Sequence, residues 1–124
     1  MANKFSFRKR ALSFVYAFRG LAHVVRTQHN IWIDLILASI AILLGLFLSI
    51  SNTEWLCLTI VISLVLAAEV FNTAIEILVD LVSPKRSEKA GLIKDISAGA
   101  VLITAAGALI VGVIIFLPKI INLI

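Results

Sequence analysis

Charged residues are scarce in this sequence of 124 residues. Asp, Glu, Lys and Arg make up 15% of it, against about 25% in an average soluble domain. Hydrophobic residues make up 61%, and the mean hydropathy is +1.11. A soluble monomer of this size could not bury so much apolar surface, and disordered chains contain far less of it. The composition excludes both classes and predicts a small integral membrane protein, with residues 1–124 forming a single membrane domain.

Cysteine and several well-known motifs are also missing. Cys57 is the only cysteine, which excludes an internal disulfide and a metal site of the Cys/His type. No GxxxxGK[ST] or GxGxxG loop occurs, so the chain is neither a P-loop enzyme nor a protein kinase. We expect no signal peptide at the N-terminus, because Arg19 and Arg26 interrupt its apolar residues.

Three long apolar runs are present, and each is long enough to cross a bilayer, which takes about 20 residues. A polar Ser-Asn-Thr turn separates the first two runs. Pro84 is expected to end the second run and Pro118 the third, because proline disfavours helix at and before its own position. We therefore expect an all-α membrane protein with spans at 31–50, 54–82 and 92–117 and a loop at 83–91.

The segment at 5–27 precedes the spans and predicts an amphipathic helix. Its apolar residues recur at alternating spacings of four and three, which places them on one stripe. Such a helix can lie in the membrane interface. The residues of this stripe are Phe7, Ala11, Phe14, Phe18, Leu21 and Val25.

Basic residues gather on one side of the predicted membrane domain. Six of the eleven precede the first span and four lie in or near the 83–91 loop, whereas the turn at 51–54 has none. Because cytoplasmic loops collect Lys and Arg, we expect the N-terminus and the 83–91 loop inside and the C-terminus outside. Membrane orientation explains this charge better than nucleic acid does, so no nucleic-acid partner is expected.

Small residues recur every four positions in the third predicted span. A stripe of this kind lets two helices approach closely. We expect this span to pack against another helix, within or between subunits. The stripe consists of Ala100, Thr104, Ala108 and Gly112.

Polar residues share one face of the second predicted span, where a membrane helix normally has few. Their offsets of 0, 3, 7 and 11 residues place them within an arc of roughly 80°. An acid at the centre of a span costs at least about 2.5 kcal/mol, and like charges repel, so a packing seam explains them poorly. Carboxylate and amide oxygens suit a hard cation, and we expect a functional site. This polar stripe consists of Glu69, Asn72, Glu76 and Asp80.

Lys94 and Asp95 lie at the start of the third predicted span, on the same side as Asp80. A helix N-terminus attracts anions, and lysine is a common partner of phosphate. Acids that can hold a divalent metal, beside a basic helix start, predict a site for phosphoryl transfer at the cytoplasmic membrane surface. Further positive charge comes from Lys85, Arg86 and Lys89.

The order of these motifs resembles the prokaryotic diacylglycerol kinase family, which includes undecaprenol kinases. The resemblance rests on the run from Glu69 to Glu76, EVFNTAIE, followed by Asp80 and by Lys94-Asp95. It implies a lipid kinase that uses ATP and Mg²⁺ to phosphorylate the hydroxyl of diacylglycerol or undecaprenol. It also implies a homotrimer in the bacterial inner membrane, with sites shared between subunits at the cytoplasmic face. The surface segment and the Leu81-Val82-Ser83-Pro84 ending lean toward the undecaprenol kinases.

The resemblance implies a role for each matching residue. Glu69 would be the catalytic base at the lipid hydroxyl, and Glu76 would bind Mg²⁺ and contact the nucleotide. Asp80 and Asp34 would have supporting roles. The other implied ATP-binding residues are Lys9, Tyr16, Asn72, Lys85, Arg86, Ser87, Lys94 and Asp95.

One position departs from the family pattern. The family usually has a glutamate after the surface helix that shares the metal with Glu76, and this sequence has Gln28 there. An amide oxygen binds Mg²⁺ more weakly than a carboxylate, so we expect a weaker metal site or help from Asp34. Two other functions stay open: a small ion or drug transporter, because intramembrane acids also mark ion pathways, and a catalytically silent family member.

Overall fold

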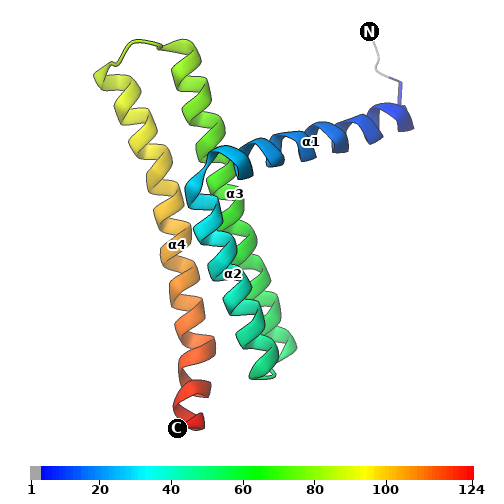
Figure 1. The fold of residues 1–124 in the computed structure, drawn as a ribbon, viewed down its shortest axis with the longest axis vertical. Coiled ribbons are helices and arrows are strands. Elements are labelled where there is room, and N and C mark those ends of the chain that lie inside the picture. Colours follow the sequence, from blue (N-terminus) through cyan, green and yellow to red (C-terminus); the bar gives the residue numbers. More distant parts are fainter. Residues whose placement is uncertain (1–3) are drawn as a thin grey trace.

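Four α-helices make up the described part of the chain, residues 4–124, in a computed structural model (Figure 1). They are α1 (Phe7–Thr27), α2 (His29–Phe47), α3 (Asn52–Val82) and α4 (Glu88–Leu123). The last three are each long and apolar enough to cross a membrane. The predicted all-helical class with three candidate spans is therefore confirmed.

Side-chain caps determine where α3 and α4 begin. Glu54 N–H donates to Ser51 Oγ at 3.2 Å, and Ser51 N–H donates back to Glu54 Oε1 at 3.0 Å. This capping box satisfies N–H groups that the first helical turn leaves free. Ser87 Oγ accepts from the N–H of Ala90 at 3.1 Å, so α4 begins at Glu88 and not at residue 92 as predicted.

The end of α4 also differs from the prediction. The helix continues through Pro118 to Leu123, so the expectation that proline ends it is wrong. A proline removes one N–H donor, but unwinding the chain in apolar surroundings would leave more backbone groups unpaired. Beyond the proline, Lys119 Nζ lies 2.7 Å from Glu54 Oε2 and ties the end of α4 to the start of α3. The predicted ends of α1 at Thr27 and of α3 at Val82 are confirmed, the latter just before Pro84. The predicted starts of α1, α2 and α3 and the predicted end of α2 are two or three residues from the observed ones.

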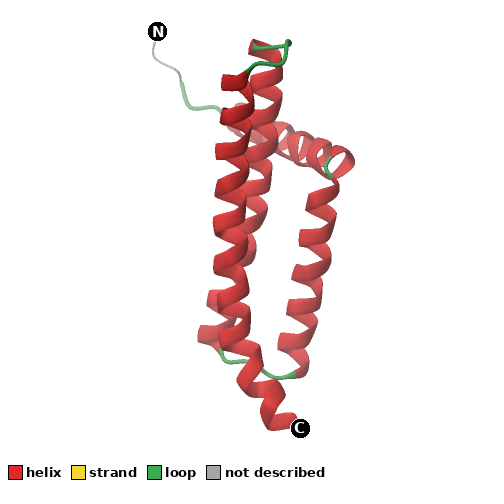
Figure 2. Cartoon of the chain, turned by 90° about the vertical axis from the view of Figure 1, so that its left-hand side faces the viewer, coloured by secondary structure: helices red, strands yellow, loops and turns green. Residues whose placement is uncertain are grey.

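The helices are arranged as a long hairpin with a shorter helix beside it. α3 and α4 form the hairpin, α2 stands next to it, and α1 runs across the long axis of all three (Figures 1 and 2). Trp32 Nε1 donates to the carbonyl of Val25 at 2.8 Å and braces the corner between α1 and α2. The connected ends of α3 and α4 reach beyond the level of α1 (Figure 1).

Tight packing is concentrated at the end of the bundle far from α1. Gly45 is buried there, and a Cβ on it would lie 2.8 Å from the ring of Trp55. The absence of a side chain is what lets α2 approach α3 at this point. The buried apolar cluster at this end consists of Ile50, Leu58, Ile115 and Phe116.

Elsewhere the three long helices leave much apolar surface uncovered. The chain exposes 9744 Å², whereas a compact protein of 13.5 kDa would expose about 6,500 Å². Large exposed apolar side chains occur on every long helix, among them Phe47, Phe71 and Leu109. Such a surface suits a bilayer or neighbouring helices and not water.

Candidate functional site

A polar cavity of about 330 Å³ lies between the start of α2 and the middle of α3 and α4. Asp34 from α2 lines it together with Glu69 and Asn72 from α3. Within the described residues, Asp34 Oδ2 and Asn72 Oδ1 are buried without a hydrogen-bond partner. Because every one of these oxygens can accept a hydrogen bond or bind a cation, the cavity is suited to a hydroxyl donor or a metal ion.

The polar stripe of α3 leads out of this cavity toward water. Glu69 is only 6% exposed, whereas the side chain of Asp80, three turns further along, is 66% exposed. Between them, Asn72 Nδ2 donates to Glu76 Oε1 at 3.1 Å, and both residues are half-buried. Thr73, which borders the stripe, is buried and donates to the carbonyl of Glu69 at 2.9 Å. One face of α3 therefore carries a buried carboxylate, Glu69, and an exposed one, Asp80.

Lys94 meets the stripe at its solvated end. Its Nζ lies 2.6 Å from Asp80 Oδ1, so the structure pairs this lysine with a carboxylate. Both side chains are partly exposed, at 38% for Lys94 and 66% for Asp80, and an exposed pair of this kind is weak. A phosphate group can therefore compete with Asp80 for the lysine. Asp95, the neighbour of Lys94, is exposed.

Other residues expected at the site are not brought to the polar stripe within one chain. Lys85 and Arg86 are exposed in the connection between α3 and α4, and Ser87 is used as the cap of α4. Lys9 and Tyr16 are exposed on α1, which leads away from the bundle (Figure 1).

The metal ligands that the sequence suggests are only partly assembled. No group of three His, Cys, Asp or Glu side chains in the described chain is arranged to hold a metal ion. Gln28 is half-buried at the α1–α2 junction, where its Nε2 donates to Thr27 Oγ1 at 3.5 Å. Glu76 does offer a carboxylate, held by the N–H of the Asn72 amide, and Mg²⁺ commonly takes one or two carboxylates together with phosphate and water oxygens. The donor chemistry therefore fits Mg²⁺ when a phosphate completes the set.

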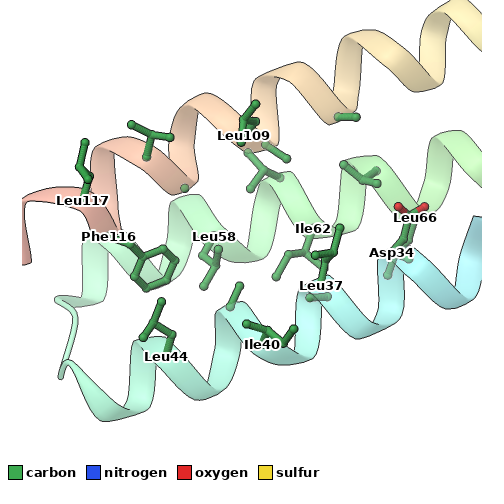
Figure 3. A pocket seen from close by; sticks show the side chains of 18 of the residues that line it. Asp34, Leu37, Ile40, Leu44, Leu58, Ile62, Leu66, Leu109, Phe116 and Leu117 are labelled. Atoms are coloured by element: carbon green, nitrogen blue, oxygen red, sulfur yellow. The ribbon is translucent and has the colours of Figure 1, made fainter. Parts of the chain in front are cut away.

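An apolar groove of about 490 Å³ extends from the polar cavity between α2, α3 and α4 (Figure 3). Asp34 lines both spaces and stands at one end of the groove, and Phe116 and Leu117 lie at the other. Ala108 and Gly112 of the small-residue stripe also line it. An amphiphile with a polar head and a long apolar chain matches this arrangement.

Sequence reasoning missed both the groove and one polar residue beside it. Asn30 lines the polar cavity with Asp34, from one turn earlier on α2. Its spacing of four residues from Asp34 was a signal that could have found it. The groove had no such signal, because apolar residues line every face of these helices.

A helical bundle with three candidate spans and an acidic cavity beside an apolar groove suits a membrane protein that handles a lipid-like molecule. The chain belongs to the prokaryotic diacylglycerol kinase family, whose model matches residues 15–116. This membership confirms the resemblance seen in the sequence and indicates a lipid kinase.

Two relatives have names that agree with the family. An undecaprenol kinase of Bacillus subtilis is 37% identical over 107 residues, which cover 86% of this chain and 87% of the relative. A diacylglycerol kinase of Synechocystis is 35% identical over 113 residues, which cover 90% of this chain but 65% of the relative. The two names differ in the lipid acceptor.

Proposed function

We propose that this protein transfers the γ-phosphate of ATP to the hydroxyl of a membrane lipid, in a reaction that depends on Mg²⁺. The observation that carries the proposal is the polar stripe of α3. It leads from Glu69, buried in the polar cavity that Asp34 connects to the apolar groove, to an exposed ion pair with Lys94. A lipid hydroxyl suits the buried end of the stripe, and a nucleotide suits the solvated end.

Glu69 is the proposed general base. The oxygen of the lipid hydroxyl attacks the γ-phosphorus, its proton passes to the Glu69 carboxylate, and the bond from the γ-phosphorus to the β–γ bridging oxygen breaks to release ADP. Glu69 is buried in the polar cavity with Asp34 and Asn72. Asp34 Oδ2, which lacks a partner among the described residues, can accept a hydrogen bond and orient the hydroxyl.

The nucleotide is proposed to bind at the solvated half of the stripe. Glu76 and Asn72 would hold Mg²⁺ together with phosphate oxygens, and the ion would neutralise charge on the transferring phosphoryl group. Lys94 would exchange Asp80 for a phosphate. Lys9, Tyr16, Lys85, Arg86, Ser87 and Asp95 are the remaining proposed ATP-binding residues, with Gln28 a proposed second metal ligand.

The complete site is proposed to form in a homotrimer. One chain leaves Lys9 and Tyr16 on a helix that leads away from the stripe, so a neighbouring subunit is needed to bring such groups to the nucleotide. The uncovered apolar faces of α2, α3 and α4 offer the surface for assembly. We place α1 in the interface of the bacterial inner membrane, with the site on the cytoplasmic side.

Undecaprenol is the acceptor that we favour over diacylglycerol. The undecaprenol kinase relative matches over nearly its whole length, whereas the diacylglycerol kinase relative is covered only to 65%. The apolar side chains in Figure 3 line the groove from Asp34 to Phe116 and Leu117, and a single long isoprenoid chain suits such a lining.

A direct assay tests the proposal. The purified protein in mixed micelles receives Mg²⁺, labelled ATP and either undecaprenol or diacylglycerol, with a micelle that lacks acceptor as the blank. Label in the lipid is expected from one or both acceptors, with faster incorporation into undecaprenol. No label in either lipid from an intact assembly would contradict the kinase proposal, and a preference for diacylglycerol would contradict only the choice of acceptor.

A further inference from the structure

Helix α1 carries a row of arginines that takes no part in the proposed chemistry. Arg8, Arg19 and Arg26 are separated by 11 and 7 residues, which at about 100° per residue places them within roughly 20° of one another around the helix. All three are exposed. The arginine row therefore presents three positive charges along one flank of α1 over about 27 Å.

No carboxylate neutralises this row. The first 33 residues contain six Lys and Arg but no Asp or Glu. In the described chain the ion pairs are Lys94 with Asp80 and Lys119 with Glu54, so the three arginines have no acidic partner. Arg19 lies over the ring of Tyr16 at 5.6 Å, a contact that leaves its N–H groups free to bind an anion.

An exposed apolar stripe runs beside the arginine row. Phe7, Phe14 and Phe18 are between 67% and 81% exposed, and they lie about 100° around the helix from the arginines. A helix with large apolar residues on one face and basic residues at its flank binds at the boundary between acyl chains and headgroups. Arginine suits phosphate there because its planar N–H groups bind two oxygens at once.

The position of α1 in the fold matches such a surface. The helix runs across the long axis of the three candidate spans (Figure 1), so it lies along the membrane plane when they cross the bilayer. The hydrogen bond from Trp32 to the carbonyl of Val25 fixes the corner that connects it to α2. Because of this brace, the bundle limits how α1 can turn about its own axis.

We propose that the arginine row binds the phosphate groups of anionic phospholipids and holds α1 down on the cytoplasmic leaflet. The occupant is the anionic headgroup of a bilayer lipid. The proposal concerns the binding of α1 to the membrane surface and does not depend on the kinase reaction. Each arginine is expected to increase the equilibrium constant for binding of α1 to the membrane surface about fivefold, which is the effect of one basic residue at an anionic surface.

The depth of α1 in vesicles tests this proposal on the full chain without ATP. A parent protein with Cys57→Ser and Ala11→Cys carries an environment-sensitive fluorophore on the apolar stripe. It is reconstituted in phosphatidylcholine vesicles with increasing phosphatidylglycerol. The emission of the parent is expected to shift to the blue as phosphatidylglycerol rises, and the shift is expected to vanish at about 1 M salt.

Two triple variants on this parent separate the row from net charge. R8Q/R19Q/R26Q is expected to lose the response to phosphatidylglycerol. K85Q/R86Q/K89Q removes the same charge from the region of the α3–α4 connection and is expected to respond like the parent. R8K/R19K/R26K, which keeps the charge, is expected to retain most of the response, and single Gln variants provide the same comparison if the triple does not fold.

Three results would overturn the proposal. The first is a parent whose emission does not change with phosphatidylglycerol. The second is R8Q/R19Q/R26Q with the same blue shift as the parent. The third is an equal loss of the blue shift in R8Q/R19Q/R26Q and K85Q/R86Q/K89Q. Inorganic phosphate added to pure phosphatidylcholine vesicles is expected to leave the emission unchanged, and a blue shift there would point to free phosphate and contradict a lipid occupant.

Discussion

Glu69 is the residue on which the proposed chemistry depends most. It is 6% exposed and shares a cavity with Asp34, whose Oδ2 has no hydrogen-bond partner among the described residues. Two carboxyl groups in so small a space are costly for stability alone, because each loses water and they repel each other. A ligand that brings a proton or a positive charge would offset this cost.

Replacing Glu69 by Gln should therefore remove activity without unfolding the chain. The amide has nearly the same shape but accepts no proton, and loss of a general base costs about 100-fold or more in rate. Lipid phosphorylation and the thermal unfolding midpoint are the measurements. Glu88→Gln, which changes an exposed carboxylate in the first turn of α4, is the matched control and should keep its rate. Loss of folding along with activity in Glu69→Gln would assign this residue to structure.

The amide at Gln28 leads to a prediction in the opposite direction. Its side chain is half-buried beside the start of α2, and its Nε2 is engaged only at 3.5 Å by Thr27. A carboxylate at this position adds a charged oxygen ligand, which should increase the affinity for Mg²⁺. Gln28→Glu should then reach half-maximal activity at a several-fold lower Mg²⁺ concentration, measured in a titration at saturating ATP. An unchanged titration would show that position 28 does not touch the metal.

The placement of polar residues on one face of α3 could be predicted from sequence better than their contacts. The spacing of Glu69, Asn72 and Glu76 on one face follows from helical geometry alone, and the structure bears it out in the bond between Asn72 and Glu76. The pairing of Lys94 with Asp80 could not be read in the same way, because it depends on how two separate helices pack. Lys9 and Tyr16 lie on α1, away from the polar stripe, so the geometry of one chain does not bring them to the site.

At the scale of the helices, the ion pair between Lys94 and Asp80 joins α3 to α4 near their connection. Because the pair is exposed, Asp80→Asn should lower the free energy of unfolding by less than about 1 kcal/mol. Lys94→Gln should raise KM for ATP about tenfold or more, since charge-assisted bonds to phosphate contribute about 1.5–3 kcal/mol. Unfolding in a denaturing detergent and steady-state kinetics measure the two effects. A larger loss of stability than of ATP affinity in Lys94→Gln would make the lysine structural.

The close approach of α2 and α3 depends on Gly45. A Cβ there would lie 2.8 Å from the Trp55 ring and 3.0 Å from Ile50, so Gly45→Ala must move one of these side chains. Such overpacking costs about 1–3 kcal/mol. The unfolding transition of Gly45→Ala should shift accordingly, whereas Gly107→Ala, where a Cβ meets nothing within 4 Å, should stay close to the wild type. Equal stability of the two variants would mean that Trp55 and Ile50 move aside without lowering the free energy of unfolding.

Helix existence was predictable here, and helix ends were less so. Apolar runs long enough for a bilayer identify α2, α3 and α4 directly. The ends depend on local chemistry that competes with simple rules. The cap at Ser87 starts α4 before Gly91, and the contact of Lys119 with Glu54 lies in helix that Pro118 was expected to prevent. The error at the end of α4 came from giving Pro118 more weight than the apolar residues around it.

At the scale of the whole molecule, the exposed apolar surface can contact both lipid and the neighbouring subunits of the proposed homotrimer. If three subunits share their sites, a variant that lacks one part can be completed by a variant that lacks another. Subunits with Glu69→Gln and subunits with Lys9→Gln, each low in activity alone, should recover measurable activity when they are produced together. Native mass spectrometry of the same sample should show assemblies of three chains. No recovery in mixed trimers would mean that each chain carries its own complete site.

The change in exposure along α3 has a kinetic consequence. The polar stripe begins at Glu69, which is buried, and ends at Asp80, which is exposed. These residues are 11 positions apart, which is about 16 Å of helix. Donor and acceptor can meet there while each stays in its own phase, so no lipid has to be extracted into water. The enzyme would then sense its acceptor as a mole fraction of the membrane. Diluting the acceptor lipid with a bilayer lipid that is not phosphorylated should slow turnover even when the total amount of acceptor in the assay is unchanged.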